Sequence, residues 1–322
     1  MGSSALAELI GRRATGVCLY GIAPPKRETP PDRLAEVVST QVARVRSLAP
    51  DGLVVYDVQD EADRTSAPRP FPFLPTLEPD AYADQHLAAL EVPKIVYRAV
   101  GRGSREDFAR WCDQRAAAGP RFSVLVGASS GRGQQPPVLR LDEAYDVVRA
   151  RAPELYLGGI AIAERHGAKG DEHERMIAKA ARGCRFFITQ AVYDPTSTKS
   201  LLSDYHYALE ARGQPPLPVI LTFSPCGSAK TLDFMRWLGI SIPRWLENEL
   251  RHDGDILGRS LRLCEEICAE IVAFARDKRL PIGINVESVS IRRVEIEASL
   301  ELYARLRAQM KGPQASGLGP RG

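Results

Sequence analysis

Short apolar runs alternate with longer amphipathic stretches along most of the chain. Runs of four to eight apolar and β-branched residues between such stretches are typical of buried strands. The runs that predict strands lie at residues 17–20, 53–56, 94–97, 123–126, 155–162, 185–190, 219–223 and 282–286. A continuous apolar run such as 53–56 favours a strand that is covered on both faces, as in a parallel sheet.

Apolar residues at helical spacing follow each predicted strand. Ser104 precedes Glu106 and Asp107, which suits a helix N-cap and the positive end of the helix dipole. Helices are predicted from about residue 32, from 104, from 142, over 171–182, 197–211, 228–238 and 256–276, and over a last stretch carrying Ile296, Leu300, Tyr303 and Leu306. The region between the seventh and eighth strands is longer than one helix requires.

Eight strand–helix units in 322 residues predict one (β/α)₈ TIM barrel, because that fold needs about 250 residues and accepts insertions. We expect the barrel to occupy residues 1–311 and the Gly/Pro-rich residues 312–322 to form a flexible tail. The alternative is a doubly wound open sheet, which usually has fewer strands. That fold also has a Gly-x-Gly-x-x-Gly turn after its first strand, whereas residues 21–26 read GIAPPK.

Composition is that of a globular protein, with 44% hydrophobic and 26% charged residues. The 43 basic and 40 acidic residues leave a net charge of +3, which gives no electrostatic case for a nucleic-acid partner. The chain lacks a signal-peptide pattern at residues 1–8 and any apolar run of about 18 residues, so we expect a cytoplasmic protein outside membranes.

The six cysteines form no CxxC pair. Cys264 and Cys268 lie four residues apart in a predicted helix, which places both on one face. This spacing favours buried, reduced thiols over zinc ligands or disulfides. His173 has no second histidine at metal-ligand spacing, so no metal site is predicted.

In a (β/α)₈ barrel the chemistry lies at the carboxyl ends of the strands. That rule alone selects candidate residues before any motif is considered. They are Gly21, Asp57, Arg98, Ser129, Glu164, His166, Gln190, Phe223 and Glu287.

Several of these strand ends carry a recognisable pattern. Residues 163–166 read AERH, residues 179–194 read KAARGCRFFITQAVYD, residues 242–246 read IPRWL, and residues 24–26 read PPK. These segments resemble those of methylenetetrahydrofolate reductases, most specifically from Glu164 to Asp194.

The resemblance implies a (β/α)₈ barrel that reduces 5,10-methylenetetrahydrofolate to 5-methyltetrahydrofolate with hydride from NAD(P)H through bound FAD. Gln190 would hydrogen-bond the pterin ring, and Tyr20 and Phe223 would lie in the substrate site. The cofactor would be contacted by His166, Glu164, Lys179 and Ser129.

The chain lacks the residue that serves as the proton donor in the reductases. The family's proton donor in the first strand, a glutamate, falls on Gly21, and the flavin-tuning aspartate falls in the run 127–129, which reads GAS. Two carboxylates, Asp57 and Glu287, stand instead at strand ends where the family has none. One of them could take over the acid's work, with its pKa raised by the apolar barrel mouth. The alternative is an ordinary polar strand end paired with Arg292 or Arg98.

These residues predict an enzyme of tetrahydrofolate one-carbon metabolism. Its leading form is an NAD(P)H-dependent methylenetetrahydrofolate reductase, with or without FAD, that uses Glu287 or Asp57 as its acid. One alternative is methyl or methylene transfer, including demethylation, without net reduction. Another is a non-catalytic folate-binding subunit. The sequence leaves open whether the chain forms a homo-oligomer or binds a partner protein.

Overall fold

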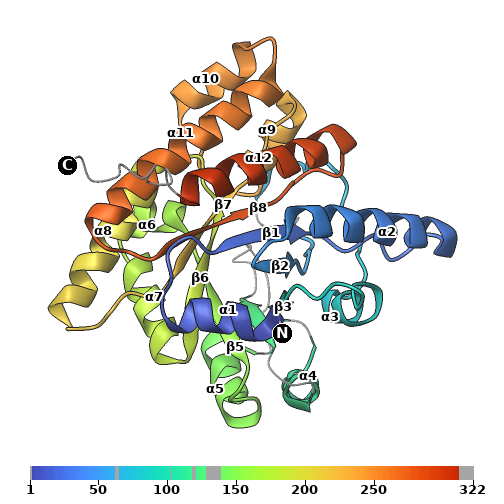
Figure 1. Ribbon diagram of the computed structural model, residues 1–322, viewed down its shortest axis with the longest axis vertical. Coiled ribbons are helices and arrows are strands. Elements are labelled where there is room, and N and C mark those ends of the chain that lie inside the picture. Colours follow the sequence, from blue (N-terminus) through green and yellow to red (C-terminus); the bar gives the residue numbers. More distant parts are fainter. Residues whose placement is uncertain (1, 62–64, 102, 118–120, 128–138, 312–322) are drawn as a thin grey trace, which may run out of the picture.

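Eight parallel strands close into a barrel in chain order, and β8 pairs with β1 to complete it (Figure 1). The computed structural model describes residues 2–61, 65–101, 103–117, 121–127 and 139–311. The predicted (β/α)₈ fold is confirmed. The predicted tail at 312–322 and the candidate Ser129 lie outside the described residues.

Every predicted strand is present, with ends that differ by at most a few residues. The strands are β1 (Cys18–Ile22), β2 (Gly52–Val55), β3 (Lys94–Ala99), β4 (Phe122–Val126), β5 (Tyr156–Ala161), β6 (Cys184–Ala191), β7 (Val219–Phe223) and β8 (Ile282–Val286). Short apolar and β-branched runs therefore identified the whole sheet.

The predicted helices also form, and they surround the barrel (Figure 1). They are α2 (Pro31–Leu48), α4 (Arg105–Ala117), α5 (Leu141–Arg151), α7 (Glu172–Ala181), α8 (Pro195–Ala211), α9 (Ala229–Trp237), α11 (Ile256–Asp277) and α12 (Arg293–Lys311). The long connection after β7 holds α9, α10 (Arg244–His252) and α11.

Among the described residues, α10 and four further elements were not predicted: α1 (Gly2–Gly11), α3 (Pro79–Ala81), η2 (Tyr82–His86) and α6 (Ala163–Lys169). The helix α6 matters most for the candidate site, because it contains Glu164 and His166. Residues two apart on a helix point about 200° apart around its axis. A strand end would present both side chains to the mouth, but α6 sends them in different directions.

Each strand divides its side chains between two apolar clusters. One cluster lies between the strands and the surrounding helices and contains Ile282, Ile284 and Val286 of β8. The other fills the barrel interior and includes Leu19, Val54, Ile95, Tyr97, Phe122, Val124, Phe186, Ile188 and Ile220. This alternation decides which residues can face the barrel mouth.

The amino-terminal end of the barrel is closed by α1, whose Leu6 and Ile10 belong to the interior cluster. Leu6 packs so closely against Gly52 that a Cβ on this glycine would lie 3.0 Å from the leucine side chain. Figure 1 shows α1 lying across this end of the strands. Ligand access to the interior is therefore from the carboxyl ends of the strands.

None of the described helices is both long and apolar enough to cross a membrane. All six cysteines are buried and unpaired, as the sequence predicts, and Cys264 and Cys268 share the inner face of α11.

We predict that Leu6→Ala lowers the free energy of unfolding by about 2–5 kcal/mol, because it opens a cavity in the barrel floor. Leu74 has 44% of its surface exposed and supplies a matched leucine control. Leu74→Ala should change the stability by less than about 0.5 kcal/mol. Urea unfolding of the three proteins checks this, and equal effects of the two substitutions would show that α1 is not part of the core.

Candidate functional site

The inward-facing residues at the carboxyl ends of β2, β3 and β8 gather polar groups inside the barrel. Tyr56 and Tyr97 meet edge to face, with ring centroids 4.8 Å apart. Glu287 follows β8, and its backbone N–H donates to the Phe223 carbonyl, which continues the sheet by one residue. The carboxyl of Glu287 therefore faces the two tyrosines at the mouth.

A chain of hydrogen bonds joins Asn285, Tyr56 and Glu287. The Asn285 Nδ2 donates to the Tyr56 hydroxyl over 2.8 Å and to Thr222 Oγ1 over 3.2 Å. The Tyr56 hydroxyl also hydrogen-bonds the Glu287 carboxyl. Because this hydroxyl accepts from Asn285, its own proton is directed to the carboxylate.

Burial raises the pKa of Glu287 to about 7, while the hydrogen bond from Tyr56 lowers it. Desolvation disfavours the charged carboxylate more than one neutral donor stabilises it. Burial, with Glu287 as a second cause, also raises the pKa of Tyr56 well above its ordinary value, so this hydroxyl stays protonated. Glu287 retains partial solvent access at the mouth, and it can give or take a proton near neutral pH.

Gly21 makes this arrangement possible. A Cβ at this position would lie 2.7 Å from the Tyr56 ring, 2.9 Å from its hydroxyl and 3.2 Å from the Glu287 Cβ. Position 21 is where the resemblance to the reductases places their acid. The structure brings Glu287 next to this position from the neighbouring strand, since Tyr20 pairs with Val286 in the β1–β8 ladder.

Asn285 holds an unsatisfied acceptor in the barrel interior. The residue is fully buried, and its Oδ1 has no hydrogen-bond partner among the described residues. A buried carbonyl without a donor is costly. A ligand N–H or a bound water would satisfy it.

The segment after β2 reaches from the mouth to α9, which follows β7. The Trp237 Nε1 donates to the Ala67 carbonyl over 3.0 Å, and Phe71 meets Phe234 edge to face at 5.3 Å. The strands β8 and β1 separate β7 from β2 in the barrel. This segment therefore connects two sides of the mouth around the end of β8, which bears Glu287.

Arg69 brings an enclosed positive charge to this segment. Its guanidinium lies over Phe73, Phe234 and Trp237 at 5.3, 5.4 and 4.9 Å from the ring centroids. Only 14% of the side chain is exposed, and the Asp60 carboxylate is 3.8 Å away. The Nε and Nη1 atoms have no hydrogen-bond partner among the described residues. Burial lowers the Arg69 pKa, and the free N–H groups suit an anionic ligand.

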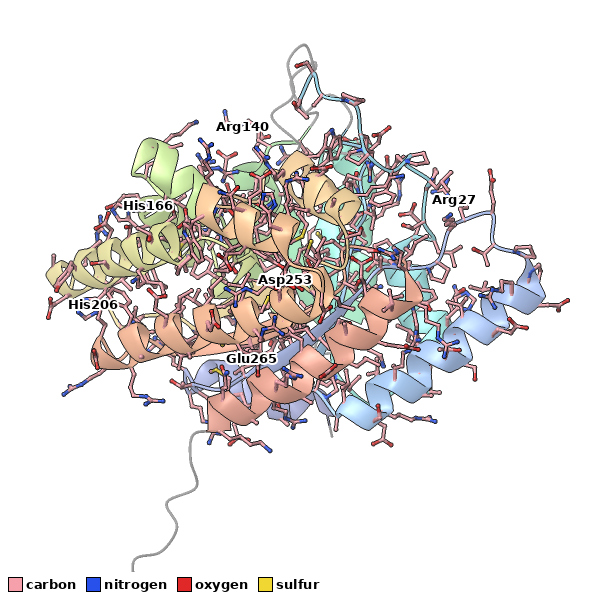
Figure 2. All side chains as sticks on the ribbon, turned by 90° about the horizontal axis from the view of Figure 1, so that it is seen from above. Arg27, Arg140, His166, His206, Asp253 and Glu265 are labelled. Atoms are coloured by element: carbon pink, nitrogen blue, oxygen red, sulfur yellow. The ribbon has the colours of Figure 1, made fainter. Side chains whose placement is uncertain are left out.

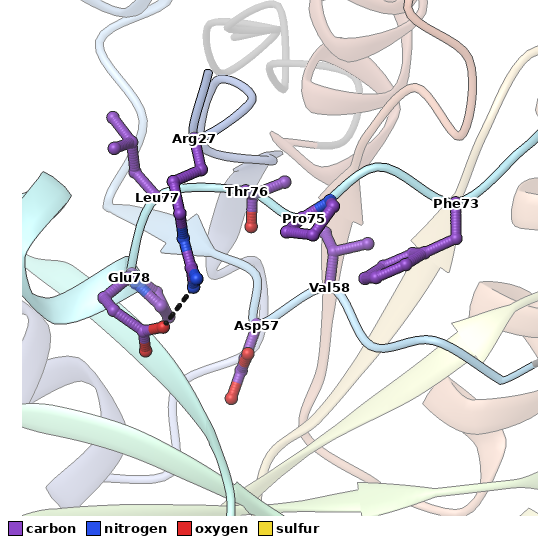
Figure 3. Close-up of a pocket in the computed structure, with 9 residues that line it drawn as sticks. Arg27, Asp57, Val58, Phe73, Pro75, Thr76, Leu77 and Glu78 are labelled. Atoms are coloured by element: carbon purple, nitrogen blue, oxygen red, sulfur yellow. Dashed lines mark hydrogen bonds and ion pairs between the residues drawn. The ribbon is translucent and has the colours of Figure 1, made fainter. Parts of the chain in front are cut away.

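Asp57, the other predicted acid, lies at the edge of a pocket of about 290 Å³ (Figure 3). Its Oδ2 accepts from the Ala99 backbone N–H over 2.8 Å, and its Oδ1 accepts from Gln59. Arg27 and Glu78 form an ion pair on the opposite wall. These bonds give Asp57 a role in joining the ends of β2 and β3.

The three predicted substrate contacts lie in different places. Gln190 is at the rim, where its Nε2 donates to the Leu238 carbonyl over 2.9 Å. Tyr20 and Phe223 belong to the cluster between strands and helices. The Tyr20 hydroxyl is 2.8 Å from Ser299 of α12. Of these three, Gln190 alone lies at the mouth.

The predicted cofactor contacts are separated by α6. The Glu164 Oε1 accepts from the Ser241 backbone N–H over 3.2 Å. His166 is buried against α8, with its Nε2 3.0 Å from Asp204 Oδ2. The Lys179 ammonium donates to the Ile160 carbonyl and lies 3.6 Å from the buried Glu172. Burial lowers the pKa of Lys179. His166 and Lys179 therefore lie in the outer helical layer and not at the mouth.

Tyr56, Asn285 and Arg69 were not selected from the sequence as site residues. A signal for Asn285 was present, because residues two positions before an inward-facing strand end share its face. Applied to Glu287, that rule gives Asn285. Arg69 lies in a Pro-rich loop without periodicity, and nothing local indicates that aromatic residues far along the chain enclose it.

Gly21 is packed closely against Tyr56 and Glu287. We predict that Gly21→Ala lowers the free energy of unfolding by about 1–3 kcal/mol, because the added methyl overpacks the mouth. Gly254→Ala is the matched control, since a Cβ there has no neighbour within 4 Å. Urea unfolding of the two variants should separate them, and equal stabilities would contradict the crowded geometry.

Comparison with solved structures finds a protein that is closely similar to this chain. A protein from Clostridium thermocellum that binds two copies of 5-methyl-5,6,7,8-tetrahydrofolic acid is 42% identical, with a TM-score of 0.84. The alignment covers 94% of this chain and 99% of that chain. Its ligand agrees with the folate part of the resemblance seen in the sequence, but this match does not extend to reductase activity.

Distant structures share only the fold. A GH113 β-1,4-mannanase is 11% identical with a TM-score of 0.50, and the alignment covers 92% of this chain and 98% of that chain. A GH10 endoxylanase from a sugarcane soil metagenome is 9% identical with a TM-score of 0.51, with coverages of 94% and 99%.

No protein-family model matches the chain, and no curated protein matches it. The assignment therefore rests on the close structure, which is aligned over nearly the full length of both chains. The chain belongs to the same protein family as the Clostridium thermocellum protein that binds 5-methyl-5,6,7,8-tetrahydrofolic acid.

Proposed function

We propose that this protein binds a tetrahydrofolate one-carbon derivative in the barrel mouth and that Glu287 protonates a ring nitrogen during the reaction. The observation that carries the proposal is the Asn285–Tyr56–Glu287 hydrogen-bond chain, with a carboxyl whose pKa is about 7. The folate ligand of the Clostridium thermocellum relative supports the substrate class.

The chemistry of the one-carbon unit requires such an acid. Opening the five-membered ring of 5,10-methylenetetrahydrofolate leaves an electron pair on a ring nitrogen that must gain a proton. An acid with a pKa near 7 is protonated in a large fraction at neutral pH and still donates readily. Glu287 meets this requirement at the position next to Gly21, where the reductases carry their own glutamate.

The remaining aromatic and amide groups at the mouth can contact a pterin ring. Tyr56 and Tyr97 supply aromatic surface for the flat ring. The unpartnered Asn285 Oδ1 can accept from a pterin N–H. Gln190 at the rim holds a side-chain amide whose Oε1 and second N–H can contact the ring.

The glutamate tail of a folate carries carboxylates, and Arg69 is the matching cation. Its Nε and Nη1 atoms, which have no hydrogen-bond partner among the described residues, can form charge-assisted hydrogen bonds to a carboxylate. The surrounding aromatic rings keep the guanidinium in place.

His166 and Lys179, two of the four residues expected to hold FAD, do not fit that group. They lie in the outer helical layer, where each is bonded to the protein. We therefore propose that a reductase reaction here takes hydride directly from NAD(P)H as a second substrate. The product would be 5-methyltetrahydrofolate.

The same observation favours a second reaction, in which a nucleophilic second substrate takes the methyl or methylene group from tetrahydrofolate without net reduction. The bond from the carbon to the nucleophile forms as its bond to the folate nitrogen breaks. The electron pair stays on that nitrogen, which needs a proton that Glu287 would supply. NADH oxidation with 5,10-methylenetetrahydrofolate distinguishes reduction from transfer. Folate binding without turnover of either substrate would overturn the catalytic proposal.

We predict that Glu287→Gln lowers kcat by about 10²–10⁴-fold, the usual contribution of a positioned general acid. In the unmodified protein, the protonated carboxyl is present below its pKa, so kcat should fall as pH rises through about 7. Tyr56→Phe removes a hydrogen bond that stabilises the carboxylate. It should raise the Glu287 pKa and move the alkaline limb to higher pH.

The exposed Glu154 gives the control variant Glu154→Gln, which should keep the original rate and pH profile. An unchanged rate and pH profile in Glu287→Gln would contradict the role of Glu287.

We predict that Arg69→Gln weakens 5-methyltetrahydrofolate binding by about 10–100-fold, the value of a charge-assisted hydrogen bond. Binding of a reduced pterin without a glutamate tail should not change. Isothermal titration calorimetry measures both, with the exposed Arg110→Gln as control. Equal losses for the two ligands would place Arg69 outside the tail site.

A further inference from the structure

Two histidines that lie seven positions apart in the sequence meet in the outer helical layer. His166 lies in α6 and His173 in α7, and their rings contact edge to face with centroids 5.4 Å apart. Gly170 ends α6 in the left-handed conformation, with φ of 70°, and allows α7 to turn back. Figure 2 shows His166 among the outer helices of the barrel.

Asp204 of α8 completes the group. Its Oδ2 lies 3.0 Å from His166 Nε2. One ligand atom from each of His166, His173 and Asp204 lies within 4.8 Å of the others. Two ligands about 2.1 Å from a tetrahedral zinc ion lie about 3.4 Å apart. Small side-chain rotations would therefore bring all three atoms to bonding distance of one ion.

The two imidazoles hold polar atoms that the protein leaves unsatisfied. Among the described residues, neither the His166 Nδ1 nor the His173 Nδ1 has a hydrogen-bond partner, although both atoms are buried. His166 is only 4% exposed, so water reaches this ring poorly. The ion pair with Asp204 occupies the Nε2 of His166. It leaves the Nδ1 of His166 and the Nδ1 of His173 without a partner among the described residues.

The surroundings suit a cation that enters from solvent. Asp204 is 53% exposed, which leaves a path to the group and room for a water ligand. Glu174 lies 3.6 Å from His173 Nε2, but both of its carboxylate oxygens also accept hydrogen bonds from Arg212. Two imidazoles with one or two carboxylates match divalent transition metals such as Zn²⁺, whereas Mg²⁺ and Ca²⁺ prefer all-oxygen sites.

We propose that His166, His173 and Asp204 form a binding site for a divalent transition metal, with Zn²⁺ as the fitting ion. The site ties α6, α7 and α8 together on the outside of the barrel. It is separate from Glu287 and does not depend on the proposed folate chemistry. Its effect on the mouth is indirect, because α6 also carries Glu164, which holds the Ser241 backbone.

The test uses the full chain after dialysis against a chelator, with Zn²⁺ added in isothermal titration calorimetry and in thermal unfolding. We expect one Zn²⁺ per chain and a rise in Tm of about 5 °C at zinc 100-fold above Kd. His173→Ala and Asp204→Asn should each weaken binding by about 100-fold or more. Replacing Zn²⁺ with Co²⁺ should give the visible absorption of a tetrahedral site, lost in both variants.

His206→Ala removes a histidine of α8 outside the group and keeps all six cysteines, so zinc affinity should not change. Asp204 is exposed, so Asp204→Asn tests the site even if His173→Ala folds poorly. Zinc binding of equal affinity in Asp204→Asn and the unmodified protein would overturn the proposal, as would the absence of 1:1 binding.

Discussion

Tyr56, Glu287 and the backbone at Gly21 occupy one small volume at the barrel mouth, and the contact between them constrains the rest of the site. A side chain at position 21 would collide with the Tyr56 ring and the Glu287 Cβ. A side chain at position 21, a glutamate included, would therefore require Tyr56 to move, and the glycine leaves room for the Tyr56 ring beside Glu287.

The same enclosure sets the electrostatics of the mouth. Burial opposes ionisation of Glu287, while the Tyr56 hydroxyl, oriented by Asn285, supports it. The balance leaves the carboxyl with a pKa of about 7. Arg69, held by aromatic rings on the segment that follows β2 and contacts α9, supplies an enclosed positive charge. In the proposed function, Glu287 would meet the ring end of the folate and Arg69 its carboxylate end.

The sheet was predictable because each strand is a short apolar run bounded by turns, and the barrel followed from the number of runs. Glu287 was predictable as a strand-end carboxylate. The positions of His166 and Lys179 could not be predicted from the sequence, because the direction of their side chains depends on α6 and on packing against α7 and α8. A seven-residue helix after β5 separates Glu164 from His166. The meeting of His166 with His173 likewise depends on the turn at Gly170, which no spacing rule on a single helix describes.

The central claim is that a reduced folate binds in the mouth with a ring nitrogen next to Glu287. A crystal structure of the full chain with 5-methyltetrahydrofolate at neutral pH tests it most directly. We expect at least one folate whose N5 or N10 lies within about 3.2 Å of a Glu287 carboxyl oxygen, the limit of a good hydrogen bond. A folate bound only at the outer surface, with the mouth closed by the segment after β2, would contradict the claim.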